Sequence, residues 1–176
     1  MKKLVLLFLL ISCSGLKARD LPLDTVSHVD LKEYTGKWYE IARFEQKFQK
    51  DCTAVTATYS LRKDGDIDVV NTCRKNSPTG EQKVAKAKAW VTDKHSNAKL
   101  KVQFFLRGLK LPFFAGNYWI LELGKNYEYA IIGDPSRKYL WFLSRTNSIN
   151  DSLYQELIDK AEDMHFDTSK LIKTLH

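Results

Sequence analysis

Apolar and polar residues alternate along most of this chain. Between about residue 38 and residue 145 the alternating runs are short, and turn-forming residues separate them. Alternation puts every second side chain on one face of an extended strand, whereas an amphipathic helix needs apolar residues three or four positions apart. The pattern therefore predicts strands in a segment that begins at Trp38 and over residues 53–61, 67–71, 83–92, 98–106, 117–123, 127–133 and 138–145.

Two of these runs form the clearest hairpin. In the run over residues 53–61 the apolar side chains, from Val55 to Leu61, share one face, and hydroxyl-bearing residues occupy the other. Asp64-Gly65 lies between this run and the next, and a tight hairpin turn needs a residue that tolerates positive φ, as glycine does. We expect one apolar and one solvated side for these strands.

The number of strands and the short connections between them set the architecture. Short connections favour antiparallel neighbours in sequence order, and eight such strands can close into a barrel with room for one small ligand. Alternation alone allows a β-sandwich equally well. After residue 147 the spacing becomes helical, with an apolar face that runs from Leu153 to Met164. Ser148 or Asn150 supplies the N-cap, so we expect an all-β fold with one helix packed outside.

The start of the chain has the layout of an export signal. Residues 1–3 (MKK) are positive, residues 4–11 (LVLLFLLI) are an unbroken apolar run, and the small Ser12 stands before Cys13. The apolar run is too short for a permanent membrane span, which needs about 20 residues. We therefore expect a signal peptide over residues 1–12, a lipidated N-terminus and tether over residues 13–30, and a folded domain over residues 31–176.

The junction Leu10-Ile11-Ser12-Cys13 resembles a lipobox, at which a signal peptidase cuts after a diacylglycerol has been joined to the cysteine. The resemblance implies that Cys13 becomes a multiply acylated N-terminus, with palmitate as a typical chain, and anchors the protein to a membrane. Ser14, rather than Asp, follows it, which implies the outer membrane and a periplasm-facing domain. The alternative is that Cys13 is only an apolar residue in an ordinary signal.

The other two cysteines also fit an exported protein. Once Cys13 is set aside, Cys52 and Cys73 remain, and thiols in oxidising compartments tend to pair. We therefore expect a disulfide between Cys52 and Cys73. Two unpaired small apolar side chains are the alternative.

The net charge and the absence of catalytic motifs argue against nucleic-acid binding and enzymatic activity. The formal net charge is +7, and it falls to +5 without Lys2 and Lys3 of the export signal. This modest excess favours anionic lipid surfaces, but no tight Lys/Arg cluster or zinc-finger spacing indicates nucleic-acid binding. The four histidines are scattered, and no serine lies in a Gly-x-Ser-x-Gly motif. We expect no metal, no cofactor and no enzymatic activity.

Three motifs in order resemble the signatures of the lipocalin family. Residues 36–43 (GKWYEIAR) resemble the first, in which one residue separates a glycine from a tryptophan, and residues 141–146 (WFLSRT) resemble the third, which carries an arginine. Residues 129–135 (YAIIGDP) resemble the second, although the more usual Thr-Asp pair is missing. This version resembles the branch that holds bacterial outer-membrane lipocalins, plant temperature-induced lipocalins and apolipoprotein D.

The resemblance implies an eight-stranded antiparallel up-and-down barrel with a C-terminal helix packed outside. Gly36, Trp38 and Arg145 would close one end, with the guanidinium over the indole in a structural cation–π contact. Alternation combined with family position places the ligand pocket at Tyr59, Asn71, Phe104, Tyr118 and Trp141. Aromatic walls suit apolar ligands, and one amide suits a head group or carboxyl. An interior packed solid with side chains is the alternative.

One connecting loop is apolar where loops are normally polar. By the family's architecture residues 107–116 lie at the open mouth of the barrel. The apolar side chains of this loop are Leu109, Leu111, Phe113 and Phe114, and Arg107 and Lys110 flank them. Such a loop suits contact with a membrane, with its cations at the head groups. A lid or a homodimer contact is the alternative.

The function that the resemblance implies is binding, storage or transport of a fatty acid or lysophospholipid in the barrel, for maintenance of the envelope. A structural envelope lipoprotein that acts through a protein partner is the main alternative, and a lipid-modifying enzyme is a further one. A filled interior would favour the first alternative, and turnover of a lipid would favour the second.

Overall fold

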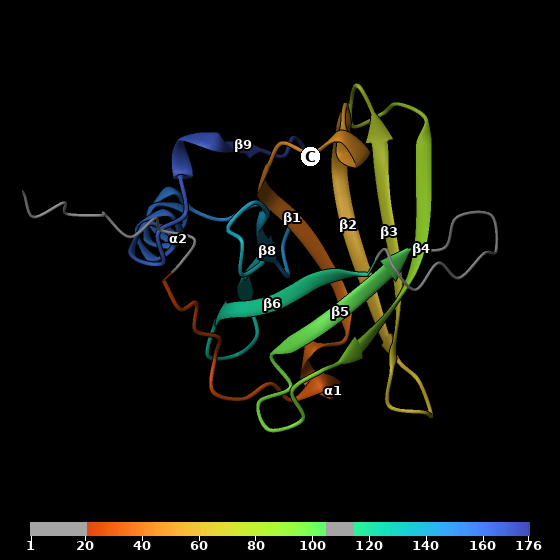
Figure 1. Ribbon diagram of the computed structural model, residues 1–176. Helices are drawn as coiled ribbons and strands as arrows, with labels where there is room; N and C mark the ends of the chain where they lie inside the picture. The colour runs from red at the N-terminus through yellow and green to blue at the C-terminus, as the bar shows by residue number, and fades with distance from the viewer. Residues whose placement is uncertain (1–20, 105–114) are drawn as a thin grey trace, which may run out of the picture.

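The computed structural model describes residues 21–104 and 115–176 (Figure 1). The strands are β1 (Gly36–Phe44), β2 (Cys52–Leu61), β3 (Ile67–Lys75), β4 (Gln82–Val91), β5 (Lys99–Phe104), β6 (Gly116–Leu123), β7 (Tyr129–Gly133), β8 (Leu140–Ser144) and β9 (Leu171–Lys173). The helices are α1 (Leu31–Tyr34) and α2 (Asp151–Asp163), with short 3-10 turns η2 (Lys47–Gln49) and η4 (Thr168–Lys170). No helix of the described residues is long and apolar enough to cross a membrane.

The first eight strands form a closed antiparallel barrel. They pair in the order β2-β3-β4-β5-β6-β7-β8-β1, and β1 pairs again with β2 from Gly36 opposite Tyr59 to Tyr39 opposite Thr56. This last pairing joins the two ends of the sheet to each other and distinguishes a barrel from a sandwich. The eight predicted strands are all present with small shifts at their ends, and the predicted barrel is confirmed.

The hairpin of β2 and β3 turns at Gly65, which has φ +85 as the sequence predicts for this position. Leu61, the last residue of β2, is 40% exposed although the alternation places it on the apolar face. At the other end of the hairpin a disulfide joins Cys52 to Cys73, whose Cα atoms lie 5.4 Å apart. The bond ties the start of β2 to the end of β3.

Helix α2 covers the outside of the barrel beside β8, as Figure 1 shows. Asn150, one of the two predicted N-caps, accepts a hydrogen bond from the backbone N–H of Leu153 at 2.8 Å. Leu157 and Ala161 are fully buried, and they pack in the same apolar cluster as Phe142 of β8. The predicted helix and its apolar face are therefore confirmed.

Two segments outside the predicted strands also pack on the barrel. Residues 21–30, assigned to the tether by the sequence analysis, contain Leu23 and Val29, which are 8% and 0% exposed. The C-terminal β9 pairs with β1 at Ala42–Phe44, on the edge where β2 has diverged from it. A strand of only three residues is too short to show alternation, which is why the sequence did not predict it.

Candidate ligand-binding site

Gly36, Trp38 and Arg145 come together at the closed end of the barrel. The guanidinium carbon of Arg145 lies 3.9 Å from the centre of the Trp38 ring, which is fully buried. Gly36 has φ +94, and a Cβ built on it would lie 3.3 Å from Arg145 Nη1. Glycine is required here because a larger residue would be strained by the backbone and crowded by the guanidinium.

Arg145 also binds the backbone around the closed end. Its guanidinium donates hydrogen bonds of 2.6 to 3.1 Å to the carbonyl oxygens of Glu33, Thr35, Lys37 and Tyr127. The indole Nε1 of Trp38 donates to the carbonyl oxygen of Tyr34 at 2.9 Å. Burial lowers the pKa of the Arg145 guanidinium. These contacts seal the barrel and hold α1 beneath it, so the role of both side chains is structural.

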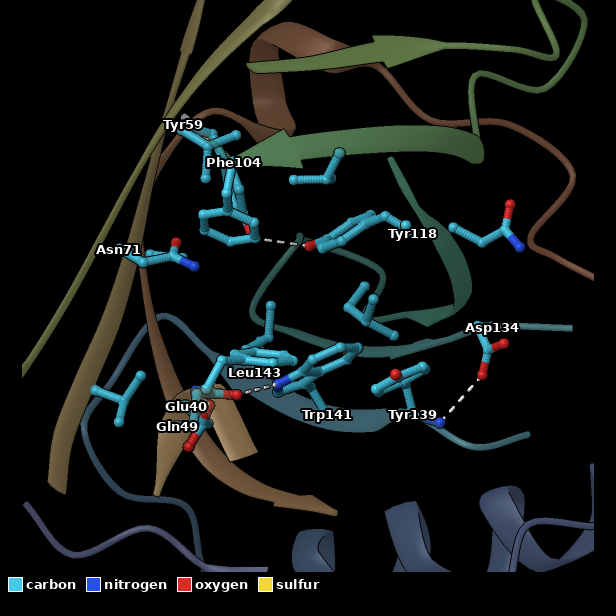
Figure 2. Close-up of a pocket in the computed structure, with 18 of the residues that line it drawn as sticks. Glu40, Gln49, Tyr59, Asn71, Phe104, Tyr118, Asp134, Tyr139, Trp141 and Leu143 are labelled. Atoms are coloured by element: carbon cyan, nitrogen blue, oxygen red, sulfur yellow. Dashed lines mark hydrogen bonds between the residues drawn. The ribbon is translucent and has the colours of Figure 1, made fainter. Parts of the chain in front are cut away.

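A cavity of about 590 Å³ lies inside the barrel (Figure 2). Its volume is within the range of small-ligand sites in proteins. All five residues that the sequence analysis places in the pocket line the cavity: Tyr59, Asn71, Phe104, Tyr118 and Trp141. Much of the remaining wall is aliphatic and includes Val55, Ala57, Val69, Val102, Ile132 and Leu143. The described interior is therefore hollow rather than packed solid.

Three tyrosine hydroxyls meet at the base of the cavity. Tyr118 Oη lies 2.7 Å from Tyr34 Oη and 2.9 Å from Tyr59 Oη. Burial raises the pKa of Tyr34 and Tyr118, and it raises the pKa of Tyr59 to about 12, so all three stay protonated at neutral pH. Each hydroxyl carries one proton, and two contacts use two of them. One O–H donor is left over for a further acceptor.

Asn71 is the polar group on an apolar stretch of wall. It lies on β3 opposite Ala57 of β2 and Ala85 of β4. Its Oδ1 atom is buried and has no hydrogen-bond partner among the described residues. Figure 2 shows the amide directed into the cavity. An unpartnered buried polar atom costs about 1–3 kcal/mol, so a ligand that donates a hydrogen bond to Asn71 would be stabilised.

A buried polar network forms another side of the cavity. Glu40 is 3% exposed, and its carboxylate accepts from Arg43 Nη1 at 2.8 Å, Gln49 Nε2 at 2.7 Å and Thr174 Oγ1 at 2.6 Å. Gln49 Oε1 accepts in turn from Trp141 Nε1 at 3.0 Å (Figure 2). The network satisfies the buried carboxylate and fixes the ring of Trp141 against the cavity.

The open end carries exposed aromatic side chains. Phe48, Tyr139 and Phe104 line the cavity and are 64%, 41% and 40% exposed. Asp134 shapes the turn between β7 and β8, because its Oδ1 accepts from the backbone N–H groups of Lys138 and Tyr139, each at 3.0 Å. The mouth is therefore an aromatic rim above the apolar interior. Leu109, Leu111, Phe113 and Phe114 lie outside the described residues, as does Cys13.

The charges in the cavity wall are acidic. Glu40 and Asp134 line the described part of the cavity, and no lysine or arginine does. Both carboxylates already accept hydrogen bonds from the protein. Within residues 21–104 and 115–176, no group of three or more His, Cys, Asp or Glu side chains is arranged to hold a metal ion. The chemistry of this site is hydrogen bonding by neutral groups within apolar walls.

Sequence reasoning missed several polar residues of this site. Alternation could have placed Glu40 on the inner face, because Glu40 lies two positions after the inward-facing Trp38 on the same strand. Tyr34 lies on a helix of four residues and Gln49 on a turn of three, and elements so short carry no periodicity. Thr174 reaches Glu40 only through the unpredicted strand β9.

Comparison with known protein sequences agrees with this architecture. The family model of the lipocalin-like domain matches residues 29–176. The outer membrane lipoprotein Blc of Escherichia coli (strain K12) is 40% identical over 165 residues, which cover 94% of this chain and 89% of that protein. Temperature-induced lipocalin-1 of Arabidopsis thaliana is 40% identical and covers 86% of this chain and 82% of its own. Apolipoprotein D of Mus musculus is 31% identical, with coverages of 82% and 76%.

Solved structures of low sequence identity share the fold. Insecticyanin from the tobacco hornworm Manduca sexta superposes with a TM-score of 0.71 at 17% identity, over 89% of this chain and 85% of that one. Lobster apocrustacyanin A1 gives a TM-score of 0.63 at 19% identity, with coverages of 82% and 78%. The barrel, the matched domain and the sequence relatives together show that this chain belongs to the lipocalin family.

Proposed function

We propose that this lipocalin binds one lipid with a single apolar chain inside its barrel, and stores or transports it without chemical change. The cavity carries the proposal: it has a volume of about 590 Å³ and mostly aliphatic and aromatic walls. One end is sealed by Trp38 and Arg145. Transfer of a chain from water into such walls contributes about 0.8 kcal/mol per methylene.

Fatty acids and lysophospholipids are the ligands that we propose. The unpartnered amide oxygen of Asn71 offers an acceptor to the glycerol hydroxyl of a lysophospholipid or to a protonated carboxyl. The exposed rim of Phe48, Tyr139 and Phe104 suits the boundary between the apolar chain and water.

A change that fills the cavity tests this proposal. Gly116 lines the cavity opposite Val102, and a Cβ built on it meets no atom within 4 Å. Gly116→Phe should therefore direct a ring into ligand space and weaken binding of a fluorescent fatty acid by roughly tenfold or more, as expected when several buried methylenes are displaced. The matched control is Val84→Phe, at a side chain that is already 55% exposed on β4. Equal affinity of the two variants would contradict the proposal.

The length of the ligand gives a second readout. Because each buried methylene contributes about 0.8 kcal/mol, affinity should rise about fourfold per methylene along a series of saturated fatty acids. The rise should stop when the cavity is full. Affinity that does not depend on chain length would point to the alternative, an envelope lipoprotein that acts through a protein partner. Release of a free fatty acid from a bound lysophospholipid would point to an enzyme.

We further propose that Cys13 is lipidated and anchors the barrel to the outer membrane, facing the periplasm. The lipobox-like junction supports this, as does similarity to proteins named as outer membrane lipoproteins. Cys13→Ala should release the protein from the membrane fraction of cells, and a variant that stays wholly in that fraction would contradict the anchor.

The apolar loop with Leu109, Leu111, Phe113 and Phe114 is proposed as a membrane contact at the mouth, with a homodimer contact as the alternative. Phe113→Ser combined with Phe114→Ser should weaken liposome binding of the Cys13→Ala protein. Unchanged liposome binding, together with a shift from dimer to monomer in sedimentation, would favour the homodimer contact.

A further inference from the structure

Charge is distributed unevenly between two sides of the barrel. Strands β4 (QKVAKAKAWV) and β5 (KLKVQF) together contain five lysines and no acidic residue. Helix α2 (DSLYQELIDKAED) has the reverse composition, with five acidic residues and one lysine. In Figure 1, α2 and β4 lie at opposite sides of the molecule. Strand β4 and helix α2 therefore carry opposite charge at opposite sides of the molecule.

Four of these lysines point outward from the sheet. Lys86 and Lys88 alternate with Ala87, which is 2% exposed and faces the interior, and Lys99 and Lys101 alternate with Leu100, which is 3% exposed. We call this outer surface the lysine face, and it consists of Val84, Lys86, Lys88, Trp90, Lys99, Lys101 and Trp119.

Indole rings lie between the lysines of this face. Trp90 of β4 is opposite Lys101 of β5, and Lys99 of β5 is opposite Trp119 of β6. The Nζ atom of Lys99 lies 4.6 Å from the centre of the Trp119 ring. Val84 adds an aliphatic side chain that is 55% exposed. The face thus combines cations with apolar and aromatic groups.

Most of the positive charge on this face is free to bind a partner. Lys88 is 2.5 Å from Asp66 and is thereby neutralised. Among the residues that the structure describes, no carboxylate lies within 4.0 Å of the Nζ atoms of Lys86, Lys99 or Lys101. These three cations therefore lack a counter-charge within the described part of the protein.

We propose that the lysine face docks on the surface of an anionic phospholipid bilayer. Lysines next to a membrane are attracted by anionic head groups, and tryptophan is favoured at the boundary between head groups and acyl chains. The acidic α2 lies across the molecule from β4, so contact through Lys86 and Lys88 of β4 keeps it away from the negative surface. The docking needs neither a ligand in the cavity nor an anchor at Cys13, so it can be tested separately from the proposed function.

Vesicle binding by the full-length chain with Cys13→Ala tests the docking, because this variant has no acyl anchor. It should sediment with vesicles of phosphatidylglycerol and phosphatidylcholine, and only weakly with vesicles of phosphatidylcholine alone. Each lysine at an anionic surface contributes about fivefold to the affinity. Lys86→Glu combined with Lys101→Glu should therefore weaken binding to the anionic vesicles by at least about 25-fold.

The matched control changes the same net charge elsewhere. Lys170→Glu combined with Lys173→Glu alters two exposed lysines in η4 and β9, beside α2 and across the molecule from β4 (Figure 1). This control should keep most of the affinity, because charges more than about 10 Å from the bilayer are screened at 0.1 M salt. An equal loss in the two variants would overturn the proposal, since it would show an effect of net charge alone.

Two further results bear on the docking. Absence of binding to anionic vesicles at low salt would also overturn it. If the double Glu variant does not fold, as judged by its circular dichroism spectrum, Lys86→Gln combined with Lys101→Gln replaces it, and retention of full affinity in that variant would overturn the proposal. If the Cys13→Ala protein is folded but binds no fatty acid, that result contradicts the proposed function and not the docking.

Discussion

Gly36 connects backbone conformation to the seal at the closed end. Its φ is +94, and Arg145 Nη1 occupies the space where a Cβ would point. We predict that Gly36→Ala lowers the free energy of unfolding by about 1–3 kcal/mol, from backbone strain and displacement of the guanidinium. Gly65→Ala is the control, because Gly65 has φ +85 but no atom within 4 Å of its Cβ position. Urea unfolding should show the larger loss for Gly36→Ala, and equal losses would rule out the contribution of Arg145.

The buried tyrosines at the base of the cavity should make the free energy of unfolding fall as the pH rises above about 10. Burial raises the pKa of Tyr59 to about 12, whereas the unfolded chain releases this proton near pH 10. The folded protein therefore holds a proton that the unfolded chain has lost, and the free energy of unfolding should fall between about pH 10 and pH 12, by up to about 1.4 kcal/mol per pH unit. Below pH 10 this contribution is fully present.

Substitution of Tyr59 separates this effect from general alkaline damage. Tyr59→Phe should lower stability at pH 8 by about 1 kcal/mol, because the hydrogen bond to Tyr118 is lost. It should also make the decline above pH 10 shallower. Tyr139→Phe, which removes the hydroxyl of an exposed ring, is the matched control. Chemical unfolding at several pH values gives these slopes, and a Tyr59→Phe slope equal to the parent's would contradict the proposed cause.

Strand β9 and the three residues after it close a gap between β1 and β2. Thr174 N–H donates to the carbonyl oxygen of Ile41 at 2.9 Å, and the N–H of Ala54 donates to the carbonyl oxygen of Leu175 at 2.6 Å. Thr174 Oγ1 reaches the buried carboxylate of Glu40. Deletion of residues 174–176 should lower the free energy of unfolding by about 3 kcal/mol, at roughly 1 kcal/mol per lost hydrogen bond.

Amide exchange gives the local readout of this deletion. Loss of the tail should speed hydrogen exchange at Ala54, whose N–H bonds to the tail, and leave exchange at Ile132 in the core unaffected. Thr174→Val is the control that keeps the backbone pairing and removes only the hydroxyl. If Ala54 exchanged no faster in the deletion variant, the tail would not close the wall.

Elements with a repeating pattern could be predicted from the sequence, and single contacts could not. Alternation located all eight barrel strands, and helical spacing with Asn150 located α2. Closure of the barrel came from the resemblance, because alternation does not specify which edges meet. The four-residue α1, the three-residue β9 and the turn that carries Gln49 are set by tertiary contacts such as those of Arg145 and Glu40.

The candidate site shows the same division. Tyr59, Asn71, Phe104, Tyr118 and Trp141 all line the cavity, as alternation and family position predicted. Tyr34 supplies the third of the three tyrosine hydroxyls, and it lies on the short helix α1, where no strand pattern applies. Leu61 shows the limit of alternation at a strand end: its face is correct for an interior residue, yet it is 40% exposed.

The whole molecule is a closed barrel around a cavity, and the elements at its two ends and on its outside maintain this architecture. Arg145 seals one end, the aromatic rim of Phe48, Phe104 and Tyr139 surrounds the other, and α2 covers the outside. A protein that filled its interior with side chains would gain packing energy, so about 590 Å³ of space has a cost in stability. That cost is offset when a lipid chain fills the space, and bound ligand should raise the melting temperature.

Native mass spectrometry tests the central claim most directly. The chain with Cys13→Ala is purified from cells without detergent, its mass is measured under native conditions, and any bound lipid is extracted and identified. We predict one fatty acid or lysophospholipid per barrel, and its loss in Gly116→Phe. A barrel that is empty as purified and that also fails to take up an added fluorescent fatty acid would contradict the account.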